Sequence, residues 1–298
     1  MSGMHRDRVE TKQEIKKNEW HRHLCQLAAT VFFNGYAKGF LSGKLYNGKG
    51  KYVCVPVLNC YSCPGALGAC PIGALQAVAG GSRHSISFYI LGSLMLVGTV
   101  IGRLACGFLC PFGFVQDILH KLPVPKVRIP QKADHLLRWI KYVLLLLLVL
   151  LLPALVADPF GQGTPWFCKY LCPAGTLEGG VFHMIANPQL RQMAGALFTW
   201  KVAVLALVLA GAVFIERFFC KYLCPLGAFY GLFNRFAFFR MQIDKHGCID
   251  CGKCESVCPM NVKVREDINS AECIRCGRCK AACPAGAVRS SFQKNRAF

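Results

Sequence analysis

The last fifth of the chain carries two near-copies of one cysteine run. Each copy has two residues between its first three cysteines, three residues before the fourth, and a proline directly after it. This spacing is typical of a 4Fe-4S cluster site. Eight cysteines in this pattern predict two clusters and a protein through which electrons pass. The runs are Cys248, Cys251, Cys254, Cys258 and Cys273, Cys276, Cys279, Cys283.

The doubled run resembles bacterial-type two-cluster ferredoxins. In such an arrangement the fourth cysteine of each run binds the cluster of the other run. Paired C-x-x-C also suits a zinc module, but zinc needs neither a third cysteine at the same interval nor a duplicated Cys-Pro. The predicted ligands are Cys248, Cys251, Cys254 and Cys283 for cluster 1, and Cys273, Cys276, Cys279 and Cys258 for cluster 2.

The rest of the chain has the composition of a membrane protein. Hydrophobic residues make up 54% of the sequence and charged residues only 17%. The formal charge of +20 could suggest nucleic-acid binding. However, the basic residues lie beside the apolar segments and in the N-terminal arm, where lipid headgroups account for them. We therefore expect membrane lipid, and not nucleic acid, as a partner. The first 23 residues lack an apolar core, so we expect no cleavable signal peptide.

Four apolar stretches of about 20 residues are candidates to cross a bilayer. The predicted spans are Leu24–Leu41, Ile86–Leu104, Trp139–Ala157 and Ala196–Phe219. The expected fold is an α-helical membrane protein with four transmembrane helices in two duplicated halves, followed by a small α+β two-cluster ferredoxin domain. Its expected divisions are a basic N-terminal arm (1–23), a four-helix membrane domain (24–240) and the ferredoxin domain (241–298).

The distribution of Lys and Arg predicts the orientation of these spans. Basic residues concentrate in the N-terminal arm and in the loop between the second and third spans, and such segments stay on the cytoplasmic side. We expect a multi-pass protein of the cytoplasmic (inner) membrane of a prokaryote. Four spans then place both termini, and with them the ferredoxin domain, in the cytoplasm.

A second cysteine pattern recurs through the predicted membrane domain. Three copies of C-x-x-x-C-P-x-G are present, and a fourth, ending in Cys70-Pro-Ile-Gly, has a displaced first cysteine. Such a repeat usually reflects duplicated structure. On the predicted topology, one set lies at the inner face and the other at the outer face. The inner set is Cys106, Cys110, Cys220 and Cys224, and the outer set is Cys54, Cys60, Cys63, Cys70, Cys168 and Cys172.

Three interpretations of these sets stay open. Cysteines at i and i+4 share one helical face, where they bind metal, form a redox disulfide, or pack as inert thiols. The inner four are sufficient to hold one further iron-sulfur cluster inside the membrane. The outer six suit redox or metal chemistry, and equally a structural disulfide. Cys25 stands alone in the first predicted span, so we interpret it as a packing residue.

The combination of motifs resembles the NapH, NosR and MauN group of membrane iron-sulfur proteins. The matching features are several spans, C-x-x-x-C-P motifs at span ends (Cys106/Cys110 and Cys220/Cys224), and the two-cluster tail. The resemblance implies a quinol dehydrogenase component that passes electrons toward a reductase. This chain departs from the group in its additional outer cysteines, and it lacks both a long flavin-binding domain and the C-x-x-C-H haem motif.

The preferred function is membrane electron transfer between a cytoplasmic or quinol donor and a membrane or extracytoplasmic acceptor, with redox partner proteins on one or both sides. Quinone is a further candidate cofactor, and His120 or His183 could hydrogen-bond its carbonyl. Two alternatives stay open. One is an exporter of reducing equivalents to an extracytoplasmic disulfide or metal ion, and the other is an iron-sulfur sensor.

Overall fold

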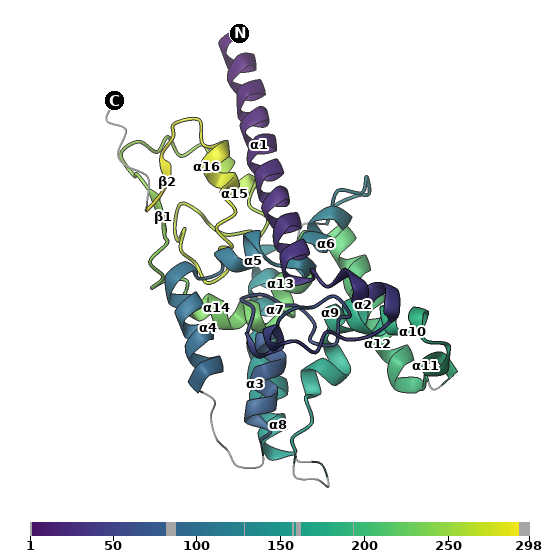
Figure 1. Ribbon diagram of the computed structural model, residues 1–298. Helices are drawn as coiled ribbons and strands as arrows, with labels where there is room; N and C mark the ends of the chain where they lie inside the picture. Colours follow the sequence, from purple (N-terminus) through teal and green to yellow (C-terminus); the bar gives the residue numbers. More distant parts are fainter. Residues whose placement is uncertain are drawn as a thin grey trace.

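The computed structural model describes residues 2–81, 88–127, 129–156, 158, 162–192 and 194–291. It is mostly helical, with one two-stranded antiparallel sheet in the C-terminal tail (Figure 1). The strands β1 (Met241–Ile243) and β2 (Val288–Ser290) pair Met241 with Ser290 and Ile243 with Val288. Two short helices, α15 (Lys253–Ser256) and α16 (Arg278–Ala282), complete the tail. These strands and helices lie within residues 241–298, where the sequence predicts the ferredoxin domain.

One local arrangement recurs in the helical part. A long helix leads to a first cysteine, and a second cysteine then caps a helix whose first residue is the proline of the C-P motif. Proline suits this position because it has no N–H to leave unpaired there. The four capped helices are α3 (Pro71–Ala79), α6 (Pro111–Leu119), α9 (Pro173–Gly175) and α14 (Pro225–Phe233). The leading helices are α1 (Ser2–Phe33), α4 (Phe88–Ile101), the continuous run Gln131–Leu155 and α12 (Ala196–Phe214).

Shorter helical segments connect or extend these leading and capped helices. The run Gln131–Leu155 consists of α7 (Gln131–Leu144), the π-helical η2 (Leu145–Leu151) and α8 (Leu152–Leu155). The first cysteines lie on α5 (Leu104–Phe108), η3 (Phe167–Leu171) and α13 (Phe218–Tyr222). The remaining segments are α2 (Ala37–Ser42), η1 (Lys49–Tyr52), η4 (Thr176–Val181), α10 (Phe182–Ala186) and α11 (Pro188–Gln192).

Among the described residues, two helices are long and apolar enough to cross a membrane, Gln131–Leu155 and Ala196–Phe214. Phe88–Ile101 is apolar but shorter, and the first two residues of its predicted span, 86 and 87, lie outside the described residues. Gly102, with φ of +54°, follows the end of this helix. The predicted first span does not form one helix, because α1 ends at Phe33 and the chain turns before α2. The predicted basic arm is instead continuous with α1.

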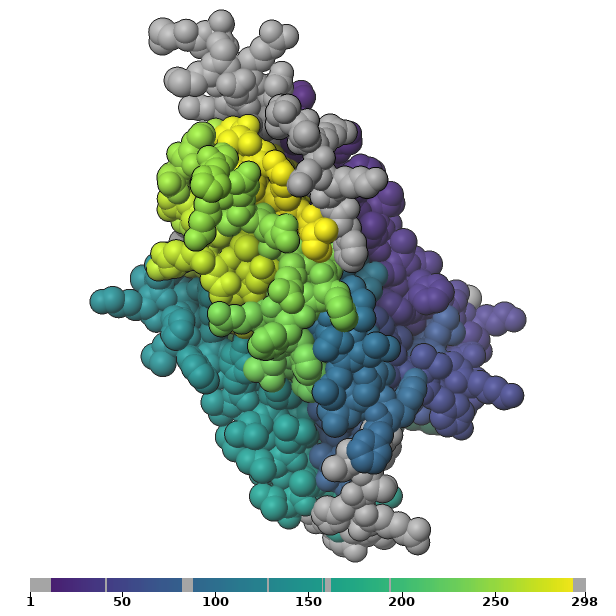
Figure 2. All heavy atoms as spheres, turned by 90° about the vertical axis from the view of Figure 1, so that its left-hand side faces the viewer, coloured from purple at the N-terminus to yellow at the C-terminus, as the bar shows by residue number. Residues whose placement is uncertain are grey.

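The tail covers one end of the helical part, as Figure 2 shows in yellow and light green. Arg275 of the tail donates to the backbone oxygens of Ile101 and Asn234. The side chain of Asn234 donates in turn to the oxygen of Cys273. At the opposite end of the molecule lie α3 and α8 (Figure 1). The tail is therefore held against α4 and α14 by paired polar groups.

Candidate redox centres

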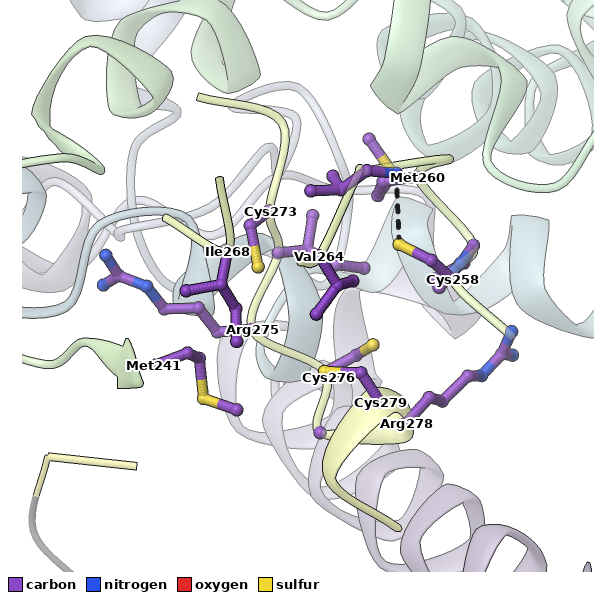
Figure 3. A pocket seen from close by; sticks show the side chains of 14 residues that line it. Met241, Cys258, Met260, Val264, Ile268, Cys273, Arg275, Cys276, Arg278 and Cys279 are labelled. Atoms are coloured by element: carbon purple, nitrogen blue, oxygen red, sulfur yellow. Dashed lines mark hydrogen bonds between the residues drawn. The ribbon is translucent and has the colours of Figure 1, made fainter. Parts of the chain in front are cut away.

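The predicted cluster 2 cysteines surround one small cavity in the tail. Cys258, Cys273, Cys276 and Cys279 all line it, and Figure 3 shows their sulfur atoms around a shared space. The sulfur of Cys258 accepts a hydrogen bond from the backbone N–H of Val262 at 3.4 Å. Such N–H donors stabilise a thiolate that binds metal. Although Cys258 belongs to the first run in sequence, the structure groups it with three cysteines of the second.

The predicted cluster 1 cysteines line a second tail cavity. This cavity is bordered by Cys248, Cys251, Cys254 and Cys283, so Cys283 lies with the first run. Cys251 is exposed, whereas Cys276 of the other group is buried in the same core as Cys106 and Cys110. The cluster 1 group therefore lies toward solvent, and the cluster 2 group against the helical part.

Four more cysteines gather directly beneath the tail. We name Cys106, Cys110, Cys220 and Cys224 the proximal quartet; all four are buried. Burial, together with the neighbouring thiols of Cys220 and Cys106, raises the pKa of Cys110 well above its usual value. The sulfurs of Cys110 and Cys224 each accept a hydrogen bond from the amide of the motif glycine, Gly113 and Gly227. Buried thiols with oriented N–H donors suit iron-sulfur ligation.

The proximal quartet contacts the tail closely. A Cβ atom added to Gly107 would lie 2.5 Å from the backbone oxygen of Ile274, a residue between two cluster 2 cysteines. Only a glycine allows this approach without displacement of the neighbouring backbone. The proximal quartet and the cluster 2 group are therefore adjacent.

A further quartet forms from the first and third motifs. We name Cys60, Cys70, Cys168 and Cys172 the distal quartet; all four line a cavity of about 910 Å³. A Cβ atom on Gly175 would lie 3.6 Å from the sulfurs of both Cys60 and Cys172. Cys60 is therefore the partner of Cys70. It occupies the position that the first cysteine of C-x-x-x-C-P-x-G has in the other three motifs.

One glutamine in each quartet binds a cysteine sulfur. Gln116 Nε2 donates to Cys220 Sγ at 3.1 Å, and Gln116 Oε1 accepts from the backbone N–H of Phe219. In the distal quartet Gln76 makes the same pair of bonds, to Cys168 Sγ at 3.1 Å and from the N–H of Phe167. Both glutamines lie six residues after the cysteine that precedes the motif proline. The two quartets are therefore built alike.

The same position in the other two motifs holds Glu178 and Tyr230. Glu178 accepts a hydrogen bond from the backbone N–H of Cys60, and burial raises the pKa of its carboxyl to about 7. Burial and the nearby thiols of Cys106, Cys54 and Cys70 raise the pKa of Tyr230. Because Cys106 is proximal and Cys70 distal, fully buried Tyr230 lies between the two quartets. Both quartets also share one hydrophobic core.

Three cysteines remain outside these groups. Cys25 is exposed, so its predicted role as a packing residue is wrong. Cys63 is buried beside Cys60 but does not line the cavity of the distal quartet. Cys54 lies near Tyr230, in a bridge that pairs it with Ala69. In the described part of the chain, all nineteen cysteines are free, so no disulfide joins the outer set.

Both candidate quinone histidines border cavities beside a cysteine group. His183 lines the cavity of the distal quartet, where Nε2 lies 3.0 Å from the backbone oxygen of Ser62. His120 lines a cavity of about 370 Å³ next to Cys258, and its Nδ1 is buried without a hydrogen-bond partner. The larger cavity also contains Lys201 and Asn59, whose buried side-chain amide has no hydrogen-bond partner.

The donor sets fit iron-sulfur clusters better than single ions. Within the described ranges, no three or more His, Cys, Asp or Glu side chains form a group that could hold a metal ion. A 4Fe-4S cluster is larger than one ion, and four cysteine thiolates hold it. Each of the four groups brings four cysteines together, and the two quartets and the cluster 2 group are the more buried ones. The thiols thus suit the larger metal centre.

Family models match most of the chain between residues 84 and 284. A model described as a 4Fe-4S binding domain matches residues 84–130, 142–187 and 197–245, and one described as a 4Fe-4S dicluster domain matches residues 240–284. An uncharacterized protein of Methanocaldococcus jannaschii is 31% identical over 208 residues, which are 67% of this chain and 70% of the relative. The chain belongs to a family of ferredoxin-type 4Fe-4S proteins.

Two of the three protein types that the motifs suggested, MauN and NosR, are among the similar proteins. The methylamine utilization ferredoxin-type protein MauN of Paracoccus denitrificans is 32% identical over 55% of this chain, and the putative electron transport protein YccM of Escherichia coli is 26% identical over 61%. The chain spans about half the length of each, 50% and 48% respectively. Regulatory protein NosR of Stutzerimonas stutzeri is also similar. No solved structure matches the chain. The predicted resemblance to this group of ferredoxin-type proteins is confirmed.

Several residues at these centres were not predicted from the sequence. Gln76, Gln116 and Glu178 have a sequence signal, since they recur six residues after a C-P cysteine. Arg103 and Arg217 have one as well, since each lies three residues before the first cysteine of its motif. These side chains contact residues of a different motif, and the spacing within one motif does not show which motif that is.

Proposed function

We propose that this ferredoxin-type protein is a four-cluster electron relay built into a membrane. The observation that carries the proposal is the continuous series of cysteine groups, from the exposed cluster 1 group through the cluster 2 group and the proximal quartet to the distal quartet. Each neighbouring pair shares a core or a close backbone contact. A series of this kind replaces one long transfer across a bilayer with shorter steps.

In this proposal the tail cysteines hold two 4Fe-4S clusters with crossed fourth ligands, and each quartet holds one more. Bound clusters would supply one-electron carriers. The protein would supply buried thiolates, N–H donors to sulfur and exclusion of water. The grouping of Cys258 and Cys283 with the opposite runs supports the crossed assignment.

The membrane setting is part of the same proposal. The helices Gln131–Leu155 and Ala196–Phe214 present exposed apolar side chains such as Leu146, Trp200 and Leu207. Exposed apolar surface on long helices suits contact with lipid. We assign two further spans to the described helices α1 and α4, in two duplicated halves, with the tail and both termini in the cytoplasm of a prokaryote. The divisions 1–23, 24–240 and 241–298 belong to this proposal.

The cavity at the distal quartet is the proposed site of exchange with a small redox partner. Its volume of about 910 Å³ lies in the usual range for ligand pockets. His183, Lys201 and Asn59 supply polar groups beside the cysteines, which suits a quinone carbonyl. Redox partner proteins would exchange electrons at the exposed cluster 1 group. Export to an external disulfide remains the alternative use of the same cavity.

The decisive experiment is iron and sulfide determination on anaerobically purified protein. Four clusters give about sixteen irons per chain, and two give about eight. In Cys110→Ser and Cys172→Ser variants, the count should fall by about four while the tail signals persist. A count of about eight in the unaltered protein would confine clusters to the tail.

Quinol oxidation tests the partner. Protein in liposomes should become reduced when a quinol is supplied, and the His183→Ala and Lys201→Ala variants should slow this reduction. If no quinol reduces the protein while the clusters are intact, the quinone assignment fails and the relay remains.

A further inference from the structure

The two quartets differ in charge although they are built alike. In the proximal quartet Arg217 Nη1 donates to the backbone oxygen of Cys106 at 2.7 Å, and Arg103 Nη2 donates to that of Cys220 at 3.1 Å. Each arginine lies three residues before the first cysteine of its own motif. It donates to the backbone oxygen of the first cysteine of the other motif. Both side chains are fully buried.

The distal quartet has no counterpart to this buried arginine pair. The cations nearest to it are Lys51, close to Cys60, and Lys201, close to Cys168. Both lysines are partly exposed to solvent, which screens their charge, and the carboxyl of Glu178 also lies beside Cys60. The residues three before Cys60 and Cys168 are Val57 and Pro165.

The motif glycines show the same contrast. A Cβ atom on Gly113 or Gly227 would lie 3.4 or 3.1 Å from a guanidinium nitrogen, whereas one on Gly73 or Gly175 would meet only cysteine atoms. The glycines thus border a cation in one quartet and thiols in the other.

The carboxylates near the arginines do not cancel their charge. Glu272 pairs with both Arg103, at 2.9 Å, and Lys141, at 2.5 Å. Asp117 pairs with both Arg217, at 2.6 Å, and Arg22, at 2.5 Å. Four buried cations therefore share two carboxylates, which leaves a positive excess around the proximal quartet. Charges in such a desolvated region are weakly screened.

Net charge and hydrogen bonds to sulfur are two main determinants of a cluster's reduction potential. The glutamine bonds to Cys220 and Cys168 are equal at 3.1 Å, so they do not separate the two quartets. The positive excess does separate them, because a reduced cluster carries one more negative charge than an oxidised cluster. Cations beside the proximal quartet favour its reduced form.

We propose that Arg103 and Arg217 hold the proximal cluster at a higher reduction potential than the distal cluster, so that electrons run from the distal quartet toward the proximal one. The inference rests on the proposed relay, and it adds a direction to it. The step transfers one electron: the distal cluster is oxidised and the proximal cluster is reduced, with no bond made or broken. Arg103 and Arg217 are positioning residues, since they act through the cysteine backbone and through their charge.

The test is a redox titration of the full chain, followed by paramagnetic resonance. Cys110→Ser and Cys172→Ser identify the proximal and distal signals. The proximal potential should be the higher of the two in the unaltered protein. Arg103→Gln and Arg217→Gln should each lower it by about 59 mV, which is a tenfold change in a one-electron equilibrium constant, and leave the distal potential in place.

Charge-retaining variants distinguish the effect of a lost charge from that of misfolding. Arg103→Lys and Arg217→Lys should keep the proximal potential near its original value, since the positive charge remains. Lys44→Gln removes one exposed charge and should change neither potential. A distal potential equal to or above the proximal one overturns the inference while the relay stands, and so does an unchanged proximal potential in both glutamine variants. An iron count of about eight removes the relay and the inference together.

Discussion

Gln116 joins the second motif to the fourth through a single side chain: its Nε2 donates to Cys220 Sγ at 3.1 Å, and its Oε1 accepts from the N–H of Phe219 at 3.0 Å. Gln76 repeats this relationship between the first and third motifs, at 3.1 and 2.9 Å. The amide thus fills the space between a helix and the cysteine of a distant segment. It also places an N–H donor on a candidate ligand sulfur in each quartet.

We therefore expect Gln116→Leu to lower the potential of the proximal cluster, because an N–H donor to sulfur stabilises the more negative reduced state. A shift of about 59 mV would correspond to a tenfold change in the equilibrium constant. Redox titration measures it. Gln76→Leu is the matched variant, which should shift only the distal cluster. Equal shifts of both clusters in either variant would contradict the assignment of one glutamine to each quartet.

The crossed ligands of the tail are testable one cysteine at a time. Cys258→Ala should damage the cluster 2 signal, because Cys258 lines the cavity of Cys273, Cys276 and Cys279. Cys283→Ala should damage the cluster 1 signal instead. Paramagnetic resonance on the two variants distinguishes the losses. The reverse pairing would refute the crossed assignment.

Asp117 is the shared partner of two buried guanidinium groups, and Asp117→Asn should destabilise the protein. The change leaves Arg22 and Arg217 buried without their counter-charge, which costs about 3 to 5 kcal/mol. Thermal unfolding in detergent measures the loss. Glu266→Gln is the control, since Glu266 pairs with Lys263 at an exposed site and should change stability by less than about 1 kcal/mol. Comparable losses in the two variants would show that burial of the pair is unimportant.

Gly107 sets the distance between the proximal quartet and the tail. Gly107→Ala places a methyl group 2.5 Å from the oxygen of Ile274, so the tail must move outward. We expect slower electron transfer between the tail and the proximal quartet, measured by rapid mixing, with the iron content retained. Gly92→Ala is the matched control because its Cβ would meet nothing within 4 Å. A transfer rate unchanged by Gly107→Ala would place the path elsewhere.

Local spacing was sufficient to recognise the centres of this protein. The duplicated run in the tail and the C-P motifs follow from short-range geometry, in which a few residues bring thiols to one helix start or one turn. The two strongest membrane helices were also recognisable, since length and apolar composition are properties of a continuous segment. The break after Phe33 was missed although it has a local signal, because Asn34-Gly35 is a turn pair inside the predicted span.

The sequence by itself determined that this is an iron-sulfur protein, since ligand spacing within a motif is a local property. Only the tertiary structure decided which motifs meet. The pairing of Cys60 and Cys70 with Cys168 and Cys172 depends on contacts between segments about a hundred residues apart. The exchange of Arg103 and Arg217 between motifs likewise depends on contacts between distant segments. Such contacts arise from packing of the whole chain, and they decide where the charge that sets a potential is placed.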